Sequence, residues 1–385
     1  MHSRKKYPAS QIMLIGIDCH QLEGERTGVG RVLKNLLHEW AKTKPFAANL
    51  YFRKAVSDDI QALTWGTPRI LGGSTNVFRY FGLARAARRD HVDVLFSPMY
   101  LVSPLFRGKA VPMIQDISYE AHPEWLTLKT RWVFRTMASW SAERAAAIVV
   151  PSAFTKSEIM RFYRLPEKRI TVAPLAADPV FSKPLPAGEA ERVKKDYNLG
   201  GRFLLTPGTI FTRRHIPQVL YAVEALANEF GDLQYVLIGR NETRPPFDVA
   251  RRIAHLNANA GRPVVIWKHH VPEADLAALY RTAALTVYLS DYEGFGLPVI
   301  ESLACGTPVL TNRAHALTEA GGEAAWYVGN PADAEQIAVA IHNVLTNERL
   351  RTLRVELGRA HSANFRWEKT ARIITDVFHQ LTTAA

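Results

Sequence analysis

The sequence predicts an α/β protein with two domains, each built around a parallel sheet, and three observations carry this prediction. Short apolar runs rich in β-branched residues alternate with amphipathic stretches along the whole chain. This alternation is typical of parallel strands whose sheet is covered by helices on both faces. About ten such runs occur, which is too many for one sheet of ordinary size. The 385 residues are also long for one hydrophobic core and comfortable for two.

The predicted elements follow one another in a regular order. Strands are expected at 12–17, 92–97, 110–116, 146–152, 169–174, 202–208, 233–239, 263–268, 285–290 and 307–312. Amphipathic helices are expected at 29–42, 216–230 and 274–283. Because ligands of open parallel sheets bind beyond the carboxyl ends of the strands, the residues just after each apolar run are the candidate site residues.

The best domain boundary is the stretch from 178 to 201, which is rich in proline, glycine and charge. We therefore expect an N-terminal domain over 1–182, a linker over 183–200 and a second domain over 201–364. One last amphipathic helix is expected over 365–385, packing back toward the N-terminal domain.

Composition excludes several classes of protein. The only cysteines are Cys19 and Cys305, too few for a disulfide framework, so a reducing compartment fits and both thiols are read as buried. Cys305 has no basic neighbour in sequence that would make it a nucleophile. No apolar run approaches the roughly 20 residues that span a bilayer. The basic start leads into a short apolar run that ends at Asp18, so we interpret it as a tail and first strand and not as a signal peptide.

Charge is unevenly distributed between the two halves. Residues 1–182 carry 26 Lys and Arg against 15 Asp and Glu, a balance of +11, and residues 183–385 carry 22 against 21, a balance of +1; together they make the net +12. A basic half attracts anionic lipid, nucleic acid or a phosphorylated substrate. A soluble protein with a high isoelectric point and no such partner is an equal alternative.

Two glycine loops follow predicted strands. Gly28 and Gly30 lie where the first strand meets a helix, so a ligand can approach the backbone and the exposed N–H groups of the helix. The pair does not fit G-x-G-x-x-G, and a purely structural turn is as good an interpretation. Further on, Gly208 precedes Arg213 and Arg214 at the start of another helix, and two guanidinium groups beside a glycine suit a diphosphate. A solvated charge pair is the alternative there.

The stretch DYEGFGLPVIESLAC, residues 291–305, places two carboxylates around a glycine turn. Glu293 precedes the turn, and Glu301 is expected in the first turn of the helix that Pro298 begins. A carboxylate can accept two hydrogen bonds from neighbouring hydroxyls, which suits a ribose or a pyranose. A pair of hydrolase carboxylates is the rival interpretation, although a hydrolase needs no arginine pair nearby.

Together with SLACGTPVLTN, this stretch resembles the Glu-x7-Glu signature of the retaining glycosyltransferases of family 4, which have the GT-B architecture. Further segments resemble the family in the right order over nearly the whole chain: IGIDCHQLEGERTGVGR, VVPSAFTKSEI, TPGTIFTRRHI and WKHHVPEADLAALYRTA. The resemblance implies two Rossmann-like domains facing each other across a deep cleft, the first binding an acceptor and the second a nucleotide sugar.

The resemblance also implies a role for each matching residue. Glu293 would hold the donor sugar, Glu301 the ribose, and Arg213 and Arg214 the leaving diphosphate, with Asp116 and His122 completing the catalytic set. The remaining donor contacts would come mostly from backbone at glycine turns and strand ends: Gly28, Gly30, Gly208, Arg240, His270, Val271, Gly294, Phe295, Gly296 and Leu297.

The chain departs from the family pattern at three places. His215 stands where the phosphate loop often has asparagine, and Gln115 stands where a histidine often contacts the donor sugar. His122, in SYEAHPEW, would partly substitute for that histidine, or it is an ordinary loop residue. Of the family's Pro-Asn-Gly-Val-Asp pattern, only Pro174 and Asp178 match.

The resemblance implies transfer of a sugar, with mannose from GDP-mannose favoured, to a glycan or lipid-linked acceptor as in polysaccharide or lipopolysaccharide synthesis. It implies retention at the anomeric carbon, no cofactor and no metal, and the chain has no Asp-x-Asp motif. We expect a cytoplasmic enzyme with no nucleic-acid partner, at the inner face of the cell membrane if its basic half contacts lipid. Segments 77–89 and 128–144 mix arginine with aromatic residues as interfacial helices do, or they are core helices with a solvated basic side. A nucleotide-sugar epimerase, a phosphorylase or a non-catalytic lectin-like scaffold are the alternatives.

Overall fold

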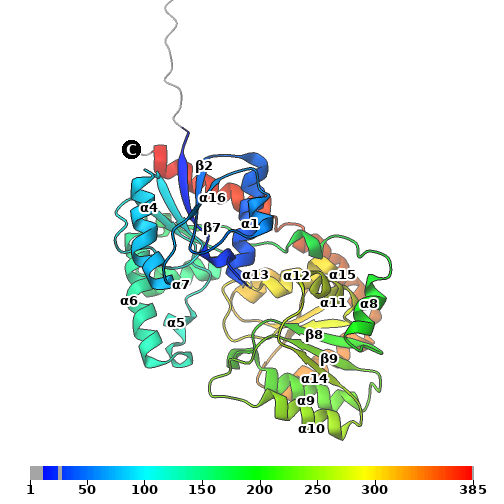
Figure 1. Cartoon of the computed structure of the whole chain (residues 1–385). Coiled ribbons are helices and arrows are strands. Elements are labelled where there is room, and N and C mark those ends of the chain that lie inside the picture. Colours follow the sequence, from blue (N-terminus) through cyan, green and yellow to red (C-terminus); the bar gives the residue numbers. More distant parts are fainter. Residues whose placement is uncertain (1–11, 25–27, 384–385) are drawn as a thin grey trace, which may run out of the picture.

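The structure is a computed structural model that describes residues 12–24 and 28–383. It consists of two α/β units stacked end to end, with the chain's last helix returning to the first unit (Figure 1). All strand pairings in both units are parallel. The predicted fold class is therefore confirmed.

The N-terminal unit contains a five-stranded sheet of order β3-β2-β1-β4-β5, and a bridge between Met113 and Val149 continues it into the pair β6-β7. Its strands are β1 (Leu14–Asp18), β2 (Ala47–Phe52), β3 (Thr67–Ile70), β4 (Val94–Ser97), β5 (Lys109–Pro112), β6 (Ile148–Val150) and β7 (Ile170–Val172). Its helices are α1 (Gly28–Thr43), α2 (Asp58–Gln61), α3 (Thr75–Val77), α4 (Leu83–Arg89), α5 (Ser118–Ala121), α6 (Leu128–Arg144) and α7 (Ala153–Tyr163), and a π-helical turn η2 (Phe78–Gly82) joins α3 to α4.

The C-terminal unit contains a six-stranded sheet of order β10-β9-β8-β11-β12-β13, the doubly wound order of dinucleotide-binding folds. Its strands are β8 (Phe203–Pro207), β9 (Gln234–Ile238), β10 (Val265–Lys268), β11 (Leu285–Val287), β12 (Val309–Asn312) and β13 (Trp326–Val328). Its helices are α8 (Glu189–Asp196), α9 (Ile216–Ala227), α10 (Val249–Asn259), α11 (Glu273–Thr282), α12 (Leu297–Cys305), α13 (Ala316–Gly321), α14 (Ala334–Thr346) and α15 (Glu348–Ser362).

All ten predicted strands are present, and three further strands escaped prediction. β3 has four exposed residues and a proline, and β13 has three residues of mixed burial, so neither shows the apolar run of a buried strand. β2 is buried over most of its length, but its apolar run begins with two alanines and carries an asparagine. The segment expected as a linker contains α8, which packs on α11.

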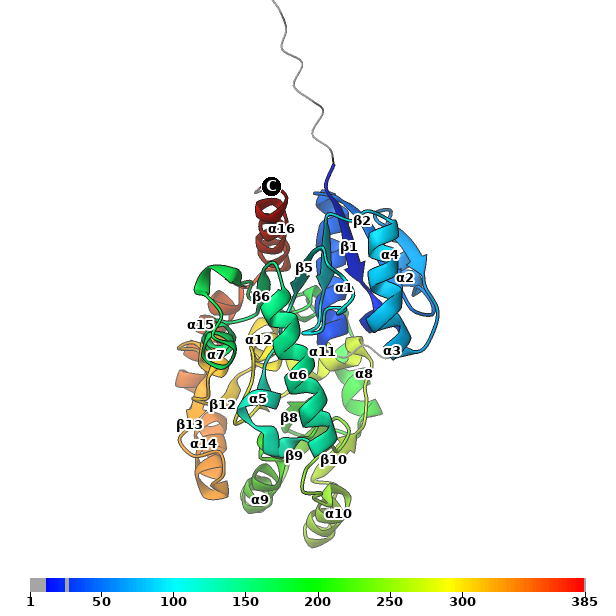
Figure 2. The same cartoon turned by 90° about the vertical axis from the view of Figure 1, so that its left-hand side faces the viewer.

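The last helix, α16 (Trp367–Thr383), lies among the elements of the N-terminal unit in both views (Figures 1 and 2). The Trp40 indole N–H on α1 donates to the Thr375 hydroxyl at 3.1 Å, and the Lys109 ammonium donates to the Leu381 carbonyl at 2.6 Å. Trp40 also packs edge-on against Phe96 and near Phe378, so α16 closes the core of the N-terminal sheet.

The two units share buried surface. One cluster of buried apolar side chains extends from β1 and α1 through α16 into α12 and α13 of the other unit. Among the described residues, no helix is both long enough and apolar enough to span a bilayer.

Candidate active site

The carboxyl ends of the two sheets meet, and Gly294 lies at their point of contact. Its carbonyl accepts hydrogen bonds from the hydroxyls of Ser152 at 2.6 Å and Thr155 at 3.0 Å, both at the start of α7. A Cβ atom on Gly294 would lie 1.8 Å from the Gln115 carbonyl oxygen, so no other residue fits in this arrangement. The contact between the units therefore requires a glycine at this position. The sequence analysis had explained Gly294 only by ligand binding.

Glu293 lies beside the arginine pair. Its carboxylate accepts from the Ser290 hydroxyl at 2.9 Å and pairs with the Arg214 guanidinium at 3.1 Å, and the Arg213 Nε lies 3.6 Å away. The sequence did not predict that one carboxylate serves both guanidinium groups. Two positive charges against one negative charge leave this cluster, which we call the arginine cluster, with a net positive charge.

The arginine cluster retains unused hydrogen-bond donors. Among the residues that the structure describes, the buried Nε atoms of Arg213 and Arg214 have no hydrogen-bond partner, although the Arg213 Nε lies at ion-pair distance from Glu293. Burial acts to lower the pKa of the Arg214 guanidinium, but the Glu293 carboxylate together with Tyr288 and Tyr280 outweighs it, so the pKa is raised and the charge is kept. Arg214 lies over the Tyr288 ring at 4.2 Å, and Arg213 lies over Phe211 at 4.8 Å. Buried cationic N–H groups without partners are suited to a polyanionic ligand.

Glu301 is held differently from Glu293. It lies in the second turn of α12 and not in the first as expected, and it is 1% exposed. One carboxylate oxygen pairs with the Arg31 guanidinium of α1 at 2.6 Å, and the other accepts from the Tyr280 hydroxyl at 2.9 Å. Glu301 was predicted to bind the ribose, but each of its carboxylate oxygens already contacts a protein group: Arg31 of the N-terminal unit and Tyr280 of the C-terminal unit.

Arg31 was missed by the sequence interpretation. It follows Gly30 in the first helix and joins the units together with Lys34, whose ammonium pairs with Glu273 at 3.1 Å. The signal was present in the motif TGVGR, where the arginine comes directly after the glycine pair, but its partner is 270 residues away. Gly28 begins α1 with open space where a side chain would stand, and Gly30 is buried.

The loop after β5 brings a second group of residues to the contact. The Asp116 carboxylate accepts from the Ser118 N–H at 2.9 Å, which fixes the loop before α5. The His122 ring stacks on Trp125 at 4.0 Å and meets Tyr292 of the other unit edge-on at 5.3 Å. Trp125, which the sequence interpretation did not select, also lies 5.4 Å from Arg213. His122 therefore lies at the contact between the units near the arginine cluster.

Gln115 has a free donor in this loop. Its side-chain nitrogen is buried and has no partner among the described residues. Gln115 stands where the family often has a histidine that contacts the donor sugar. Its free side-chain N–H group means that a hydrogen-bond donor is still available at this position.

The glycine turns expected to receive the nucleotide differ in their accessibility. Gly208 adopts φ +106°, and a Cβ on Gly239 would lie 2.1 Å from the Gly208 carbonyl oxygen, so these two strand ends are in close contact. The Gly239 carbonyl already accepts from the Trp267 indole at 2.8 Å. Arg240 and His270 are exposed, whereas Val271 packs into a core, so only its backbone can face a ligand.

The turn before α12 has a backbone geometry that suits ligand binding, but part of it packs in the hydrophobic core. Gly296 adopts φ +104° at the N-terminal cap of α12, which favours glycine, and Leu297 begins the helix. Phe295 is buried against Phe365 at 5.7 Å, so its side chain belongs to the hydrophobic core.

Cys19 and Cys305 are both buried free thiols. Within the part of the chain that the structure describes, no group of three or more acidic, histidine or cysteine residues is arranged to hold a metal ion.

Comparison with known proteins identifies the family. The family model for glycosyltransferase family 4 matches residues 26–181, and the model for group 1 glycosyl transferases matches residues 188–361. The O-antigen chain mannosyltransferase B of Escherichia coli is 30% identical over 284 residues, which is 73% of this chain and 73% of that protein. This chain belongs to the group 1 glycosyltransferases.

Further relatives agree with this assignment. The serotype-specific mannosyltransferase WbdA of Escherichia coli is 30% identical over 62% of this chain, a match that spans 29% of that longer protein. The crystal structure of WaaG, a glycosyltransferase involved in lipopolysaccharide biosynthesis, has a TM-score of 0.73 at 14% identity and covers 95% of this chain and 99% of its own. Anabaena HepE in complex with UDP-glucose has a TM-score of 0.72 at 14% identity over 97% of this glycosyltransferase and all of its own chain.

These findings confirm the family resemblance, the GT-B fold and the enzyme class. The epimerase, phosphorylase and lectin-like alternatives are therefore set aside.

Proposed function

We propose that this glycosyltransferase moves mannose from a nucleotide-diphosphate sugar to a glycan or lipid-linked acceptor, with retention at the anomeric carbon and without a metal. The observation that carries the proposal is the arginine cluster, in which the buried Nε atoms of Arg213 and Arg214 have no hydrogen-bond partner within the described part of the chain. A diphosphate would supply both acceptors and the missing negative charge.

The chemistry requires charge stabilisation at the leaving group. As the bond between the sugar C1 and the diphosphate oxygen breaks, negative charge grows on the diphosphate, and fixed guanidinium groups in a dry site stabilise it strongly. The acceptor oxygen forms the new bond to C1, and its proton passes to the departing diphosphate. In this proposal Glu293 orients both guanidinium groups, and the Gln115 side-chain nitrogen donates to a hydroxyl of the donor sugar.

The choice of mannose rests on the relatives, two of which are named as mannosyltransferases. GDP-mannose is therefore the favoured donor. The nucleotide would extend from the arginine cluster toward the ends of β9 and β10, where Gly239, Arg240, His270 and the backbone of Val271 lie.

The test compares donors and follows the product. Thermal shifts with GDP, UDP and ADP identify the base, and transfer from GDP-mannose is then measured with and without EDTA. The proton spectrum of the product should show the anomeric configuration of the donor, and EDTA should leave the rate unchanged. No shift with any of the three nucleotides contradicts the proposal.

We also propose that the N-terminal unit contacts an anionic membrane at the cytoplasmic face, where a lipid-linked acceptor would be found. The segment from α3 to α4 exposes Val77 and Phe81 and carries Arg85 and Arg88 on its surface. Apolar side chains interleaved with arginine are typical of interfacial helices. Sedimentation with phosphatidylglycerol vesicles should retain the protein, phosphatidylcholine vesicles should not, and Phe81→Ser should weaken the binding.

A further inference from the structure

His215 departs from the family pattern and stands at the start of α9, directly after the arginine pair. Its backbone adopts the left-handed conformation, with φ 54° and ψ 30°. Among residues other than glycine, asparagine, aspartate and histidine adopt this conformation most readily, so both the usual asparagine and the histidine of this chain fit the backbone. The difference between them therefore lies in what the side chain does.

The His215 side chain reaches across to the stretch 291–305 and does not cap its own helix. Its Nε2 lies 2.7 Å from the Asp291 carboxylate. An ionised carboxylate can only accept, so Nε2 carries the proton of this hydrogen bond. The imidazole has a side-chain exposure of 11% and Asp291 one of 44%, so a buried ring holds a carboxylate that is open to solvent. In the described part of the chain, no other basic side chain lies within ion-pair distance of Asp291.

Asp291 lies beside the arginine cluster. Its backbone N–H donates to the Arg213 carbonyl at 3.0 Å. Two residues further on, Glu293 already pairs with Arg214 at 3.1 Å and lies 3.6 Å from the Arg213 Nε. A second carboxylate that paired with these guanidinium groups would cancel their remaining positive charge and occupy the N–H groups that a diphosphate needs.

We propose that His215 is a positioning residue for diphosphate binding. By holding the Asp291 carboxylate, it prevents this carboxylate from pairing with the arginine cluster and keeps the cluster available to the donor. This inference rests on the proposed function, because it concerns the affinity of the cluster for the donor diphosphate. Glu293 orients the guanidinium groups, and His215 keeps the second acidic side chain of the same loop away from them.

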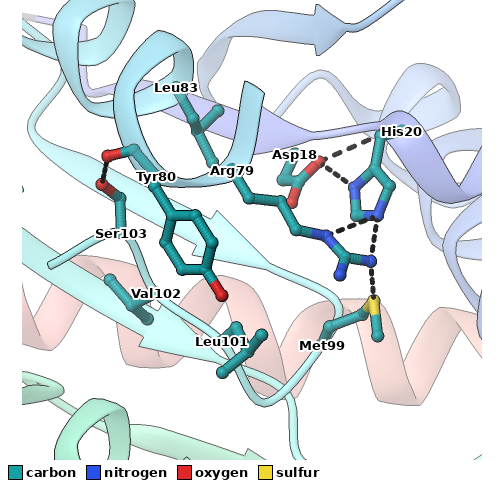
Figure 3. A pocket seen from close by; sticks show the side chains of 9 residues that line it. All are labelled: Asp18, His20, Arg79, Tyr80, Leu83, Met99, Leu101, Val102 and Ser103. Carbon is teal, nitrogen blue, oxygen red and sulfur yellow. Dashed lines mark hydrogen bonds and ion pairs between the residues drawn. The ribbon is translucent and has the colours of Figure 1, made fainter. Parts of the chain in front are cut away.

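The N-terminal unit shows how a histidine can separate an aspartate from an arginine (Figure 3). Beside the carboxyl end of β1, the His20 Nδ1 lies 2.7 Å from the Asp18 carboxylate, and its Nε2 lies 2.7 Å from a terminal nitrogen of Arg79. Dashed lines in Figure 3 join His20 to both residues, and none joins Asp18 to Arg79. The imidazole binds the aspartate there, and the guanidinium does not.

The test is a cycle of two substitutions at the His215–Asp291 pair, followed by calorimetric titration. The probes are GDP, the diphosphate of the favoured donor, and inorganic pyrophosphate, which contains no base. His215→Asn suits the left-handed backbone, but its shorter amide does not reach as far as Nε2, so the Asp291 carboxylate is released. His215→Gly, which this backbone also accepts, repeats the measurement if the asparagine variant is unstable.

Both probes should bind His215→Asn about threefold to tenfold more weakly than the wild type. This is less than the effect of losing a charged hydrogen bond outright, because the carboxylate only competes with the ligand. Guanosine, which has no phosphate, should bind both proteins equally.

Asp291→Asn removes the negative charge and keeps an acceptor for His215. Binding of GDP to this variant should be at least as strong as to the wild type. On this background His215→Asn should change GDP binding by no more than about twofold, since no carboxylate is left to compete. If His215 only supported the fold of the loop, its substitution would instead weaken GDP binding equally with and without Asp291→Asn.

His342→Asn is the matched control. The His342 Nε2 pairs with Glu229 at 2.9 Å, in the same unit but beyond the opposite end of α9. The substitution removes the same kind of pair away from the arginine cluster, so the binding of GDP, pyrophosphate and guanosine should stay unchanged. A loss of GDP binding equal to that of His215→Asn would overturn the proposal, because general loosening of the unit would then explain both results.

Transfer kinetics give a second measure of the same role. His215→Asn should raise the KM for the donor and leave the KM for the acceptor unchanged, and adding Asp291→Asn should restore the KM for the donor. Equal GDP binding by the wild type and His215→Asn, or a loss that persists in the double variant, overturns the role of His215 and leaves the proposed function in place. A wild type that binds neither GDP nor pyrophosphate contradicts the proposed function itself, before any variant is compared.

Discussion

Replacing Arg214 with glutamine should weaken the binding of a nucleoside diphosphate strongly and that of the nucleoside hardly at all. The guanidinium has a side-chain exposure of 10%, contacts Glu293 at 3.1 Å and has a buried Nε that finds no hydrogen-bond partner among the described residues. Hydrogen bonds to charged groups contribute about 1.5–3 kcal/mol each. Loss of one such contact raises the dissociation constant of the diphosphate about 10-fold to 150-fold, at 1.4 kcal/mol for each factor of ten.

The assay is calorimetric titration of the nucleoside diphosphate and of the corresponding nucleoside. Arg214→Lys keeps the charge and loses the planar fork, so its affinity should lie between those of the wild type and the glutamine variant. Arg202→Gln is the control, because Arg202 precedes the same strand, β8, at its opposite end and pairs with Asp232 at 2.9 Å. Diphosphate binding by Arg214→Gln within twofold of the wild type would refute the assignment of the diphosphate to this cluster.

The same substitution should also lower the stability of the protein without ligand. Glu293 is 9% exposed, and without Arg214 its nearest cationic atom is the Arg213 Nε at 3.6 Å. Removing Arg214 leaves Glu293 paired with Arg213, whereas removing Glu293 leaves two neighbouring buried guanidinium groups without the carboxylate that serves both. Glu293→Gln should therefore melt at a lower temperature than Arg214→Gln, and a higher melting temperature of the Glu293→Gln variant would contradict this account of the cluster.

Three further predictions concern the contact between the units and the buried thiol. Gly294→Ala should abolish most transfer and widen the particle in solution scattering, because its Cβ would lie 1.8 Å from the Gln115 carbonyl oxygen; unchanged activity would show that the contact is not needed. Arg31→Gln and Glu301→Gln should show a coupling of about 1–3 kcal/mol in a double-mutant cycle of denaturant unfolding, since they share a 2.6 Å ion pair; additive effects would contradict it. Burial raises the pKa of Cys305 to about 12, so its protonated thiol contributes stability that is lost as pH rises from about 8.5 toward 12. Iodoacetamide at pH 8.5 should accordingly label Cys305 only after unfolding, and rapid labelling of the folded protein would count against its burial.

Much of the fold was predictable because buried parallel strands have a strong local signal. The run that forms β8, FLLTP, is buried at all five positions, and such runs followed by helix-like stretches imply their own sheet. β3 escaped because an edge strand with exposed side chains lacks this signal. Strand order was not predicted, since pairing depends on contacts between segments far apart in the sequence.

The candidate site was predictable only where a residue belongs to a local sequence motif. Arg213, Arg214 and Glu293 were selected from two loops, each of which has its own pattern of glycine and charge. The contact of Arg31 with Glu301 was not predictable, because no local pattern indicates which charge 270 residues away will meet a given arginine. Trp125 was missed for the same reason, since its significance lies in the residue of the other unit that it meets.

The two glutamates of the signature stretch are therefore not equivalent. Glu293 contacts groups of its own unit and leaves part of the arginine cluster free, so a ligand can bind without displacing it. Glu301 has its carboxylate oxygens occupied by Arg31 and Tyr280, and Arg31 belongs to the other unit. A donor ribose that binds Glu301 would compete with Arg31 for a carboxylate that is 1% exposed. A ligand shifts a conformational equilibrium only through contacts that differ between the states, and an exchange of Arg31 for a ribose hydroxyl would be such a difference. Such an exchange would couple donor binding to the arrangement of the two units through one ion pair.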